Sequence, residues 1–228
     1  MILLNSPANP TGVTASEEEV RSLSELAARH NIALVSDEIY RHFCYDGSFS
    51  SPAAYNPQSI VIDGFSKSHG MTGWRVGFAG GPDKIIKAMT KVQSQSISHT
   101  AAVSQMAAVA ALNGPKDFIS ENNKVFKERR DLVVSMLNQT TGLSCPTPEG
   151  AFYVYPSCAH LIGKSTQDGK KIRSDEDFVT TLLEAEGVAA VHGGAFGLTP
   201  HFRISYATSH DLLVKAMGRI EEFCNNLS

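Results

Sequence analysis

The sequence has no excess of positive charge and no long hydrophobic run. Its 228 residues contain 20 Lys and Arg against 23 Asp and Glu, which gives a formal net charge of −3. Proteins that bind nucleic acid or an anionic membrane surface usually carry a basic excess, so the sequence favours neither partner. No apolar stretch approaches the roughly 18 residues that a membrane-spanning helix needs. The start, Met1 to Asn5, has no basic segment, so we expect no signal peptide.

Cysteines are few and widely separated. The four cysteines, Cys44, Cys145, Cys158 and Cys224, form no C-x-x-C pair, and the eight histidines form no H-E-x-x-H motif. This spacing argues against a disulfide framework and against a zinc site, and it is typical of proteins kept in a reducing compartment. We therefore expect a cytoplasmic protein without a metal.

Nucleotide-binding motifs are also missing. Residues 162–165 resemble the end of a P-loop, but the glycine that this motif requires five residues before Gly163 is Cys158. No G-x-G-x-x-G follows an expected strand. The sequence therefore gives no support to nucleotide binding.

Short apolar runs alternate with helical patterns in the first part of the sequence. Ser16 and Glu19 have the spacing of a capping box at the start of the first helix. Strands that are apolar on both faces and alternate with helices predict an α/β fold with a doubly wound, mostly parallel sheet. We expect strands at 2–5, 32–35, 60–62 and 75–79, and helices at 16–31, 83–112 and 116–138.

The pattern changes after residue 139. Short strands and helices then mix in the manner of a small α+β domain. We expect strands at 152–155, 188–191 and 202–206, and helices at 175–186 and 212–224. The sequence thus predicts two domains, with residues 1–139 forming the larger one, including a long connecting helix, and residues 140–228 forming the smaller one.

Polar residues follow three of the expected strands. Asn9, Asp37 and Lys67 each lie just past a strand end, and ligands of such sheets bind beyond the carboxyl ends of the strands. The pattern predicts a polar crevice there. On spacing alone, however, Lys67 has the ordinary interpretation of a solvated surface lysine.

The segment around Lys67 carries the most information. Residues 64–77, GFSKSHGMTGWRVG, resemble the cofactor-attachment signature of class I aminotransferases of fold type I, which use pyridoxal 5′-phosphate. Four further segments resemble the same family in the same order. Within the family, the residues of these motifs are most similar to those of bacterial aspartate aminotransferases. They are residues 5–12, 36–40, 148–153 and 202–206.

The resemblance implies catalytic roles for Lys67, Asp37 and Tyr40. Lysine offers the side-chain amine that forms a Schiff base with the cofactor aldehyde, and the same amine then carries a proton. Asp37 would keep the ring nitrogen protonated, and Tyr40 would donate to the ring oxygen. Without the resemblance, Asp37 has the alternative interpretation of a helix cap and Tyr40 that of a packing residue.

The resemblance also implies contacts to the cofactor and to the substrate. Arg75 would bind the cofactor phosphate with its planar fork, and Ser66 would add a hydroxyl contact. Asn9 would bind both the cofactor ring and the substrate, although alone it would be read as a turn residue. Arg203 would pair with the substrate α-carboxylate. Many relatives carry serine where this sequence has Gly64, which removes one phosphate contact.

The function implied is amino-group transfer from an amino acid to a 2-oxoacid, with L-aspartate and 2-oxoglutarate as the first pair to test. Three alternatives share much of the scaffold: a C–S lyase, an aminocyclopropane-carboxylate synthase and a non-catalytic effector-binding domain. The last usually accompanies a basic DNA-binding domain, which the net charge of −3 does not suggest. Full-length members are homodimers, so a homodimer is expected of the full-length enzyme.

The resemblance begins partway through the family. Roughly the first 150–170 residues of a full-length member, about one domain, have no counterpart in the sequence. We therefore expect a C-terminal portion of such an enzyme, with impaired activity on its own.

Overall fold

The computed structural model describes all residues, 1–228, and the chain divides into two compact units. The first unit comprises Met1–Ala8 and Val13–Asn123, and the second comprises Asn9–Gly12 and Lys124–Ser228. The division lies earlier in the sequence than the predicted boundary after residue 139. The reason is that Val133, Val134 and Leu137, on the expected connecting helix, are buried in the core of the second unit.

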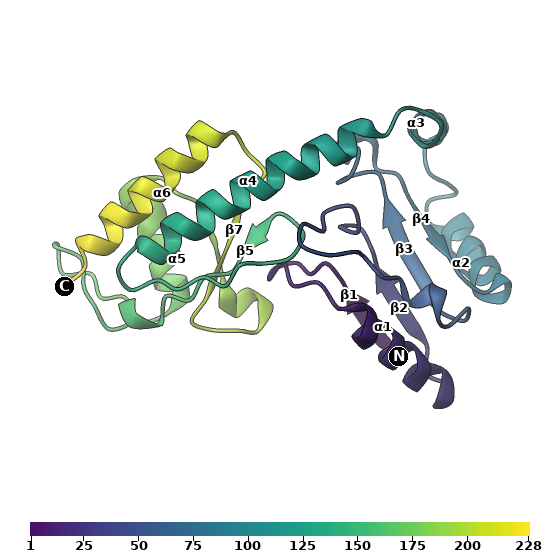
Figure 1. Cartoon of the computed structure of the whole chain (residues 1–228), viewed down its shortest axis with the longest axis horizontal. Helices are drawn as coiled ribbons and strands as arrows, with labels where there is room; N and C mark the ends of the chain where they lie inside the picture. Colours follow the sequence, from purple (N-terminus) through teal and green to yellow (C-terminus); the bar gives the residue numbers. More distant parts are fainter. The chain divides into compact units, whose positions relative to one another are not determined.

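A four-stranded sheet forms the centre of the first unit (Figure 1). The first three strands are parallel and the last is antiparallel, and the order in the sheet follows the sequence. This confirms the predicted α/β class and the mostly parallel sheet. The strands are β1 (Ile2–Asn5), β2 (Leu34–Asp37), β3 (Ile60–Gly64) and β4 (Gly77–Gly80).

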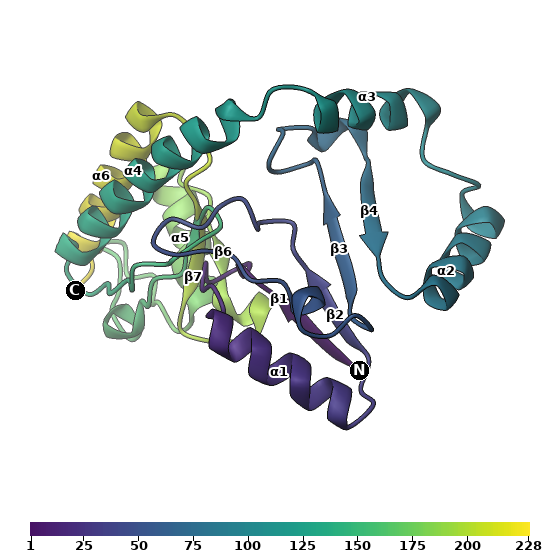
Figure 2. The same ribbon diagram turned by 45° about the vertical axis from the view of Figure 1, so that its right-hand side comes forward.

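Helix α1 (Glu17–Arg29) runs beside β1 and β2 (Figure 2). Its start confirms the predicted capping box, because the Ser16 hydroxyl accepts from the backbone of Glu19 while the Glu19 side chain accepts from the backbone of Ser16. The helix buries Val20, Ser24 and Ala27. The cap thus fixes where the helix begins, and the apolar side fixes how it packs.

The predicted single helix over 83–112 is wrong, because the structure contains two helices there. They are α2 (Asp83–Ser96) and α3 (Ala102–Asn113). Between them Ser98 has a φ of 63°, a left-handed conformation that cannot continue a right-handed helix. The chain then re-enters a helix in α3 and a further one in α4 (Asp117–Gln139), which runs from the first unit into the second.

The sheet of the first unit is covered unequally on its two faces. Leu34, Ser36 and Asp63 share one face by register and are buried. On the other face, Leu3 is 65% exposed and Ile62 is 41% exposed. Helix α2 buries none of its residues. One apolar face of the first unit therefore remains open to solvent.

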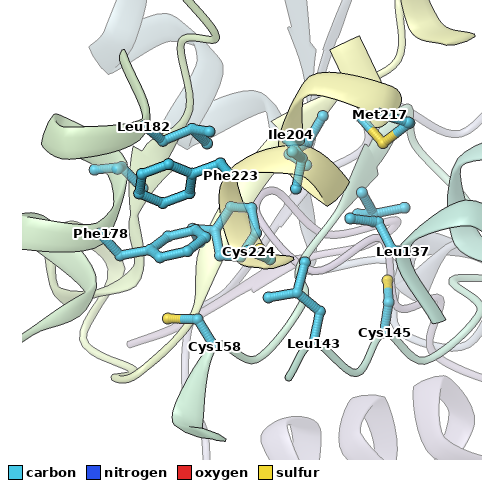
Figure 3. Close-up of a cluster of buried hydrophobic side chains, with 14 of the residues drawn as sticks. Leu137, Leu143, Cys145, Cys158, Phe178, Leu182, Ile204, Met217, Phe223 and Cys224 are labelled. Carbon is cyan, nitrogen blue, oxygen red and sulfur yellow. The ribbon is translucent and has the colours of Figure 1, made fainter. Parts of the chain in front are cut away.

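The second unit has a closed hydrophobic core (Figure 3). A three-stranded antiparallel sheet, in the order β5 (Tyr153–Val154), β7 (Phe202–Ser205) and β6 (Val191–His192), supplies part of it. Helices α5 (Asp175–Glu186) and α6 (His210–Asn225) supply Phe178, Leu182, Met217 and Phe223 to this core, and Figure 3 shows Phe178, Leu182 and Phe223 grouped together.

Candidate active site

Asp37 lies at the end of β2, level with Asn5 at the end of β1. The Asp37 carboxylate accepts a hydrogen bond from the Asn5 amide at 3.0 Å and a longer one from the backbone N–H of Ile39 at 3.3 Å. The side chain is half-buried, and no Lys, Arg or His lies within ion-pair distance of it. Asp37 is therefore an oriented carboxylate whose charge is not neutralised by the chain.

Lys67 sits in a turn that begins where β3 ends. The N–H of Gly70 donates to the Lys67 carbonyl at 3.2 Å, which closes the turn. The Lys67 Nζ lies 5.8 Å from the centre of the Tyr40 ring, within the range of a cation–π contact. Tyr40 itself is 4% exposed. The structure thus brings the Lys67 amine close to the Tyr40 ring.

Ser66 and Arg75 border one hollow of about 220 Å³ in the first unit. Arg75 ends a short 3₁₀ turn with a φ of 51°, and its Nη1 donates to the carbonyl of Thr72 at 3.0 Å. Gly64 and Gly77 line the same hollow and face each other across β3 and β4, where an added Cβ on Gly77 would lie 2.9 Å from a backbone oxygen. The guanidinium has no carboxylate partner, so it can take an anion.

The second unit brings Arg203 and Asn9 together. Arg203, on β7, donates from Nη1 to the Asn9 Oδ1 at 2.8 Å. Its guanidinium also lies 4.8 Å from the ring centre of Tyr153 and 5.0 Å from that of Phe196. No acidic side chain pairs with it. One N–H donor of the guanidinium is thus used by Asn9, and the remaining donors suit a carboxylate.

Gly12 explains why the short segment Asn9–Gly12 belongs to the second unit. Its φ is +73°, and an added Cβ would lie 2.5 Å from the Pro148 Cβ and 2.8 Å from the Gly150 carbonyl oxygen. The Gly12 carbonyl in turn accepts from the Gly150 N–H at 2.8 Å. Only glycine allows this close approach, and it fixes the turn that carries Asn9.

Sequence reasoning missed a charged pair that joins the segment after β2 to the last residues of β3. Arg41 and Asp63 form an ion pair with an Nε–Oδ2 distance of 2.7 Å, and the Asp63 side chain is 3% exposed. Burial raises the pKa of the Asp63 carboxyl, while the Gly64 N–H and Arg41 lower it. The available signal was a carboxylate that follows the apolar run Ile60-Val61-Ile62 directly.

A second buried carboxylate accompanies this pair. Glu38 is 2% exposed and accepts a hydrogen bond from the Ser51 hydroxyl at 2.6 Å. Burial raises the pKa of Glu38. Its partners are all within the fold, so Glu38 is a structural acid beside the functional candidates.

A larger hollow of about 380 Å³ lies in the second unit and contains none of the predicted site residues. Its charged lining includes Lys170 and Glu184, which pair with each other at 2.6 Å. The other charged lining residues, Asp168 and Glu186, are acidic, so the paired Lys170 is the only cation that lines this hollow. No helix of the chain combines the length and the hydrophobicity needed to cross a bilayer.

Comparison with known proteins identifies relatives along almost the whole chain. The family model "Aminotransferase class I and II" matches residues 1–220. A probable aspartate/prephenate aminotransferase of Rhizobium leguminosarum bv. phaseoli is 52% identical over 228 residues, which cover 97% of this chain and 57% of the relative. An aspartate aminotransferase of Rhizobium meliloti (strain 1021) is 50% identical and is covered to 57%.

Solved structures give the same result. The crystal structure of the aspartate aminotransferase from Rhizobium meliloti aligns with a TM-score of 0.95 at 50% identity, covering 99% of this chain and 58% of that one. The aspartate aminotransferase from Thermus thermophilus with maleate aligns with a TM-score of 0.89 at 36% identity, covering 97% and 56%. The chain spans little more than half the length of these relatives. It belongs to the class I and II aminotransferase family.

Proposed function

We propose that this chain serves amino-group transfer between an amino acid and a 2-oxoacid with pyridoxal 5′-phosphate, and that L-aspartate and 2-oxoglutarate are the substrate pair. The observation that carries the proposal is the contact of the Lys67 amine with the Tyr40 ring just beyond β3, together with the unneutralised Asp37 at the end of the neighbouring strand β2. The names of the relatives support aspartate as the amino donor. They also make prephenate a second oxoacid to test.

The residues of the first unit fit this cofactor by their chemistry. They provide one amine, one carboxylate without a cationic partner and one guanidinium without an anionic partner, from Lys67, Asp37 and Arg75. These match an aldehyde, a basic ring nitrogen and a phosphate. When bound, the cofactor supplies an electron sink for the negative charge that develops at the substrate Cα.

Each of these side chains then has a defined task. Lys67 Nζ would hold the cofactor and, when displaced by the substrate amine, would take the proton from Cα and return it. Asp37 would keep a proton on the ring nitrogen, and the Asn5 amide holds its carboxylate in place for this. The Tyr40 hydroxyl would donate to the ring oxygen. Arg75 and Ser66 would bind the phosphate at the hollow that they border.

The second unit would contribute the carboxylate contact. Arg203 would bind the substrate α-carboxylate with the donors that Asn9 leaves free, and Asn9 would orient the guanidinium and contact the substrate. The relative from Thermus thermophilus was solved with maleate, a dicarboxylate, which supports a carboxylate as the group that Arg203 recognises.

The first experiment asks where the cofactor attaches. The purified chain is mixed with pyridoxal 5′-phosphate and reduced with borohydride, and the modified peptide is identified by mass spectrometry. We expect the label on Lys67 and its loss in Lys67→Ala, with Lys87→Ala as the control because Lys87 is an exposed lysine of α2. Labelling spread evenly over surface lysines would contradict the proposal.

A second experiment separates the reaction classes. L-aspartate and 2-oxoglutarate are added to the loaded chain in one reaction, an amino acid with a thioether at Cβ is added in a second, and the products of each are analysed. A new amino acid in the first reaction supports transfer, whereas pyruvate, ammonia and the released thiol in the second would indicate a lyase. The chain spans 57% of the relatives' length, so attachment is measured before turnover.

Assembly and location belong to the same proposal. The family resemblance implies a homodimer for the full-length enzyme and a cytoplasmic location. Light scattering on the purified chain measures the assembly state directly.

A further inference from the structure

The ion pair between Arg41 and Asp63 uses both oxygens of a buried carboxylate. Arg41 Nε lies 2.7 Å from Oδ2, and the Gly64 N–H donates to Oδ1 at 2.6 Å. The Asp63 side chain is 3% exposed, whereas that of Arg41 is 41% exposed. A carboxylate buried to this extent needs a counter-charge, because an unpaired buried charge is strongly unfavourable. Arg41 is the only cation in ion-pair contact with it.

The pair joins the two segments that carry the proposed cofactor residues. Arg41 directly follows Tyr40 in the segment after β2, and Asp63 precedes the turn that carries Lys67 after β3. The Glu38 N–H donates to the Ile62 carbonyl at 2.8 Å, which extends the contact of the two segments by one backbone bond. The charged pair is thus the side-chain link next to the contact between Lys67 and Tyr40.

Several other charged groups act on the ion pair of Arg41 and Asp63. Beyond the effect of burial, the charge of Asp37 raises the pKa of Asp63 and that of His69 lowers it, while the charge of Asp63 raises the pKa of Glu38. Arg41 acts on two of these acids, since it lowers the pKa of both Asp63 and Glu38. Asp63 also borders the hollow of Ser66 and Arg75. Without Arg41, an unneutralised negative charge would therefore stand beside the proposed phosphate site.

We propose that Arg41 and Asp63 form a positioning pair for Lys67: the pair holds the segment of Tyr40 against the end of β3, so that the Lys67 amine rests on the Tyr40 ring. This inference rests on the proposed function, in which Lys67 is the attachment amine. Neither residue of the pair contacts the cofactor in this account. Their effect passes through the position of Lys67.

The test measures the accessibility of the Lys67 amine without any cofactor. The whole chain is treated with a trace of acetic anhydride, and acetylation of Lys67 is compared by mass spectrometry with that of Lys87, whose side chain is 76% exposed. We expect Arg41→Gln and Asp63→Asn each to raise the ratio of the two rates by about two- to fivefold, the factor that corresponds to losing one partly exposed cation–π contact.

The two variants distinguish positioning from a simple charge effect. If only charge mattered, removing a positive charge and removing a negative charge would change the reactivity of the Lys67 amine in opposite directions. Loss of the positioning pair instead raises the acetylation ratio in both variants. Arg41→Lys should retain most of the wild-type ratio. Arg21→Gln is the matched control, because it breaks the exposed Arg21–Glu17 pair on α1 and should leave the ratio unchanged.

The double variant Arg41→Gln/Asp63→Asn is needed in case a single variant unfolds. It removes the positioning pair without leaving an unpaired buried charge. It should also raise the ratio. A wild-type ratio in the double variant, or opposite shifts in the two single variants, would overturn the inference. Failure of Lys67 to take up pyridoxal 5′-phosphate would instead contradict the proposed function. The acetylation ratio would still test the positioning pair, since acetylation needs no cofactor.

Discussion

The two units of the chain differ in how completely they bury their apolar surface. In the second unit, Phe178, Leu182 and Phe202 are each 0% exposed and belong to one continuous core. In the first unit, the small core cluster around Phe65 is accompanied by Ile62 and Leu3 on an open sheet face. Because buried apolar area is the main stabilising term of folding, we expect the second unit to be the more stable one.

The comparison shows where the proposed chemistry lies. Lys67, Asp37 and Arg75 all belong to the unit with the smaller core, and their positions are set by strand ends, turns and charged pairs. Arg203 belongs to the unit with the closed core and projects from β7. The attachment site is therefore expected to depend on backbone pairing and on the link between Arg41 and Asp63 more than on deep burial.

The largest effect is expected from truncating the core of the second unit. Phe178→Ala removes a side chain that is 0% exposed and contacts the rings of Phe202 and Phe223. A buried Phe→Ala substitution costs about 3–5 kcal/mol. The matched substitution Phe78→Ala in the first unit, at 45% exposure, should cost clearly less. Urea unfolding followed by circular dichroism measures the free energy of unfolding of both variants. Equal losses of free energy would contradict the expected difference between the two units.

A smaller effect, with a distinct pH dependence, is expected from Arg41→Gln. Leaving the Asp63 carboxylate without its partner should cost about 1–3 kcal/mol at neutral pH. Burial already raises the pKa of Asp63 in the folded state above its ordinary value of 3.8. A raised carboxyl pKa means that stability is present at low pH and is lost as the pH rises through the folded-state value.

The variant raises that pKa further, so its deficit should be largest at neutral pH and should shrink as the pH falls toward 3.8. Unfolding free energies measured across this range test the sign. The same deficit at every pH, or a deficit that grows on acidification, would show that Asp63 is not the group responsible. Asp63→Asn should remove this part of the pH dependence.

The smallest effect is expected at the helix caps. Ser16→Ala removes the capping box of α1 in the first unit and should cost about 0.5–2 kcal/mol. Ser209→Ala removes the corresponding hydroxyl cap of α6 in the second unit. If the units unfold separately, each substitution should shift only the transition of its own unit. A common shift in a single transition would show instead that the two units unfold together.

The elements that local sequence determines were predictable. The capping box of Ser16 and Glu19 and the presence of strands near 32–35 and 60–62 follow from spacing and apolar runs, although both strands end two residues later than predicted, at Asp37 and Gly64. The break at Ser98 was missed because residues 94–100 contain no Gly or Pro, although this run is rich in residues of low helix propensity. The pairing of Arg41 with Asp63 also lay outside sequence reasoning, because it depends on the register of β2 against β3.

The contact between the proposed substrate-binding residues was also not predictable from the sequence. Asn9 and Arg203 are 194 residues apart, and no local pattern relates them. The family resemblance predicted both residues, but the hydrogen bond between them became visible only in the structure.

The most direct test of the difference between the units is thiol labelling in increasing urea. Cys145, Cys158 and Cys224 belong to the second unit, and burial raises the pKa of each to about 12, so they should stay unreactive while that unit is folded. A buried reporter for the first unit is provided by Val20→Cys, at a position that is 1% exposed. Peptide mapping by mass spectrometry then gives the urea concentration at which each thiol becomes reactive.

Our account predicts that the thiol at position 20 and the native Cys44 react at lower urea than the three cysteines of the second unit. Cys44→Ser in the same background shows that the order does not depend on that half-buried thiol. Simultaneous exposure of all the thiols, or earlier exposure of the second unit, would contradict the claim that Lys67, the proposed attachment lysine, lies in the less stable part of the chain.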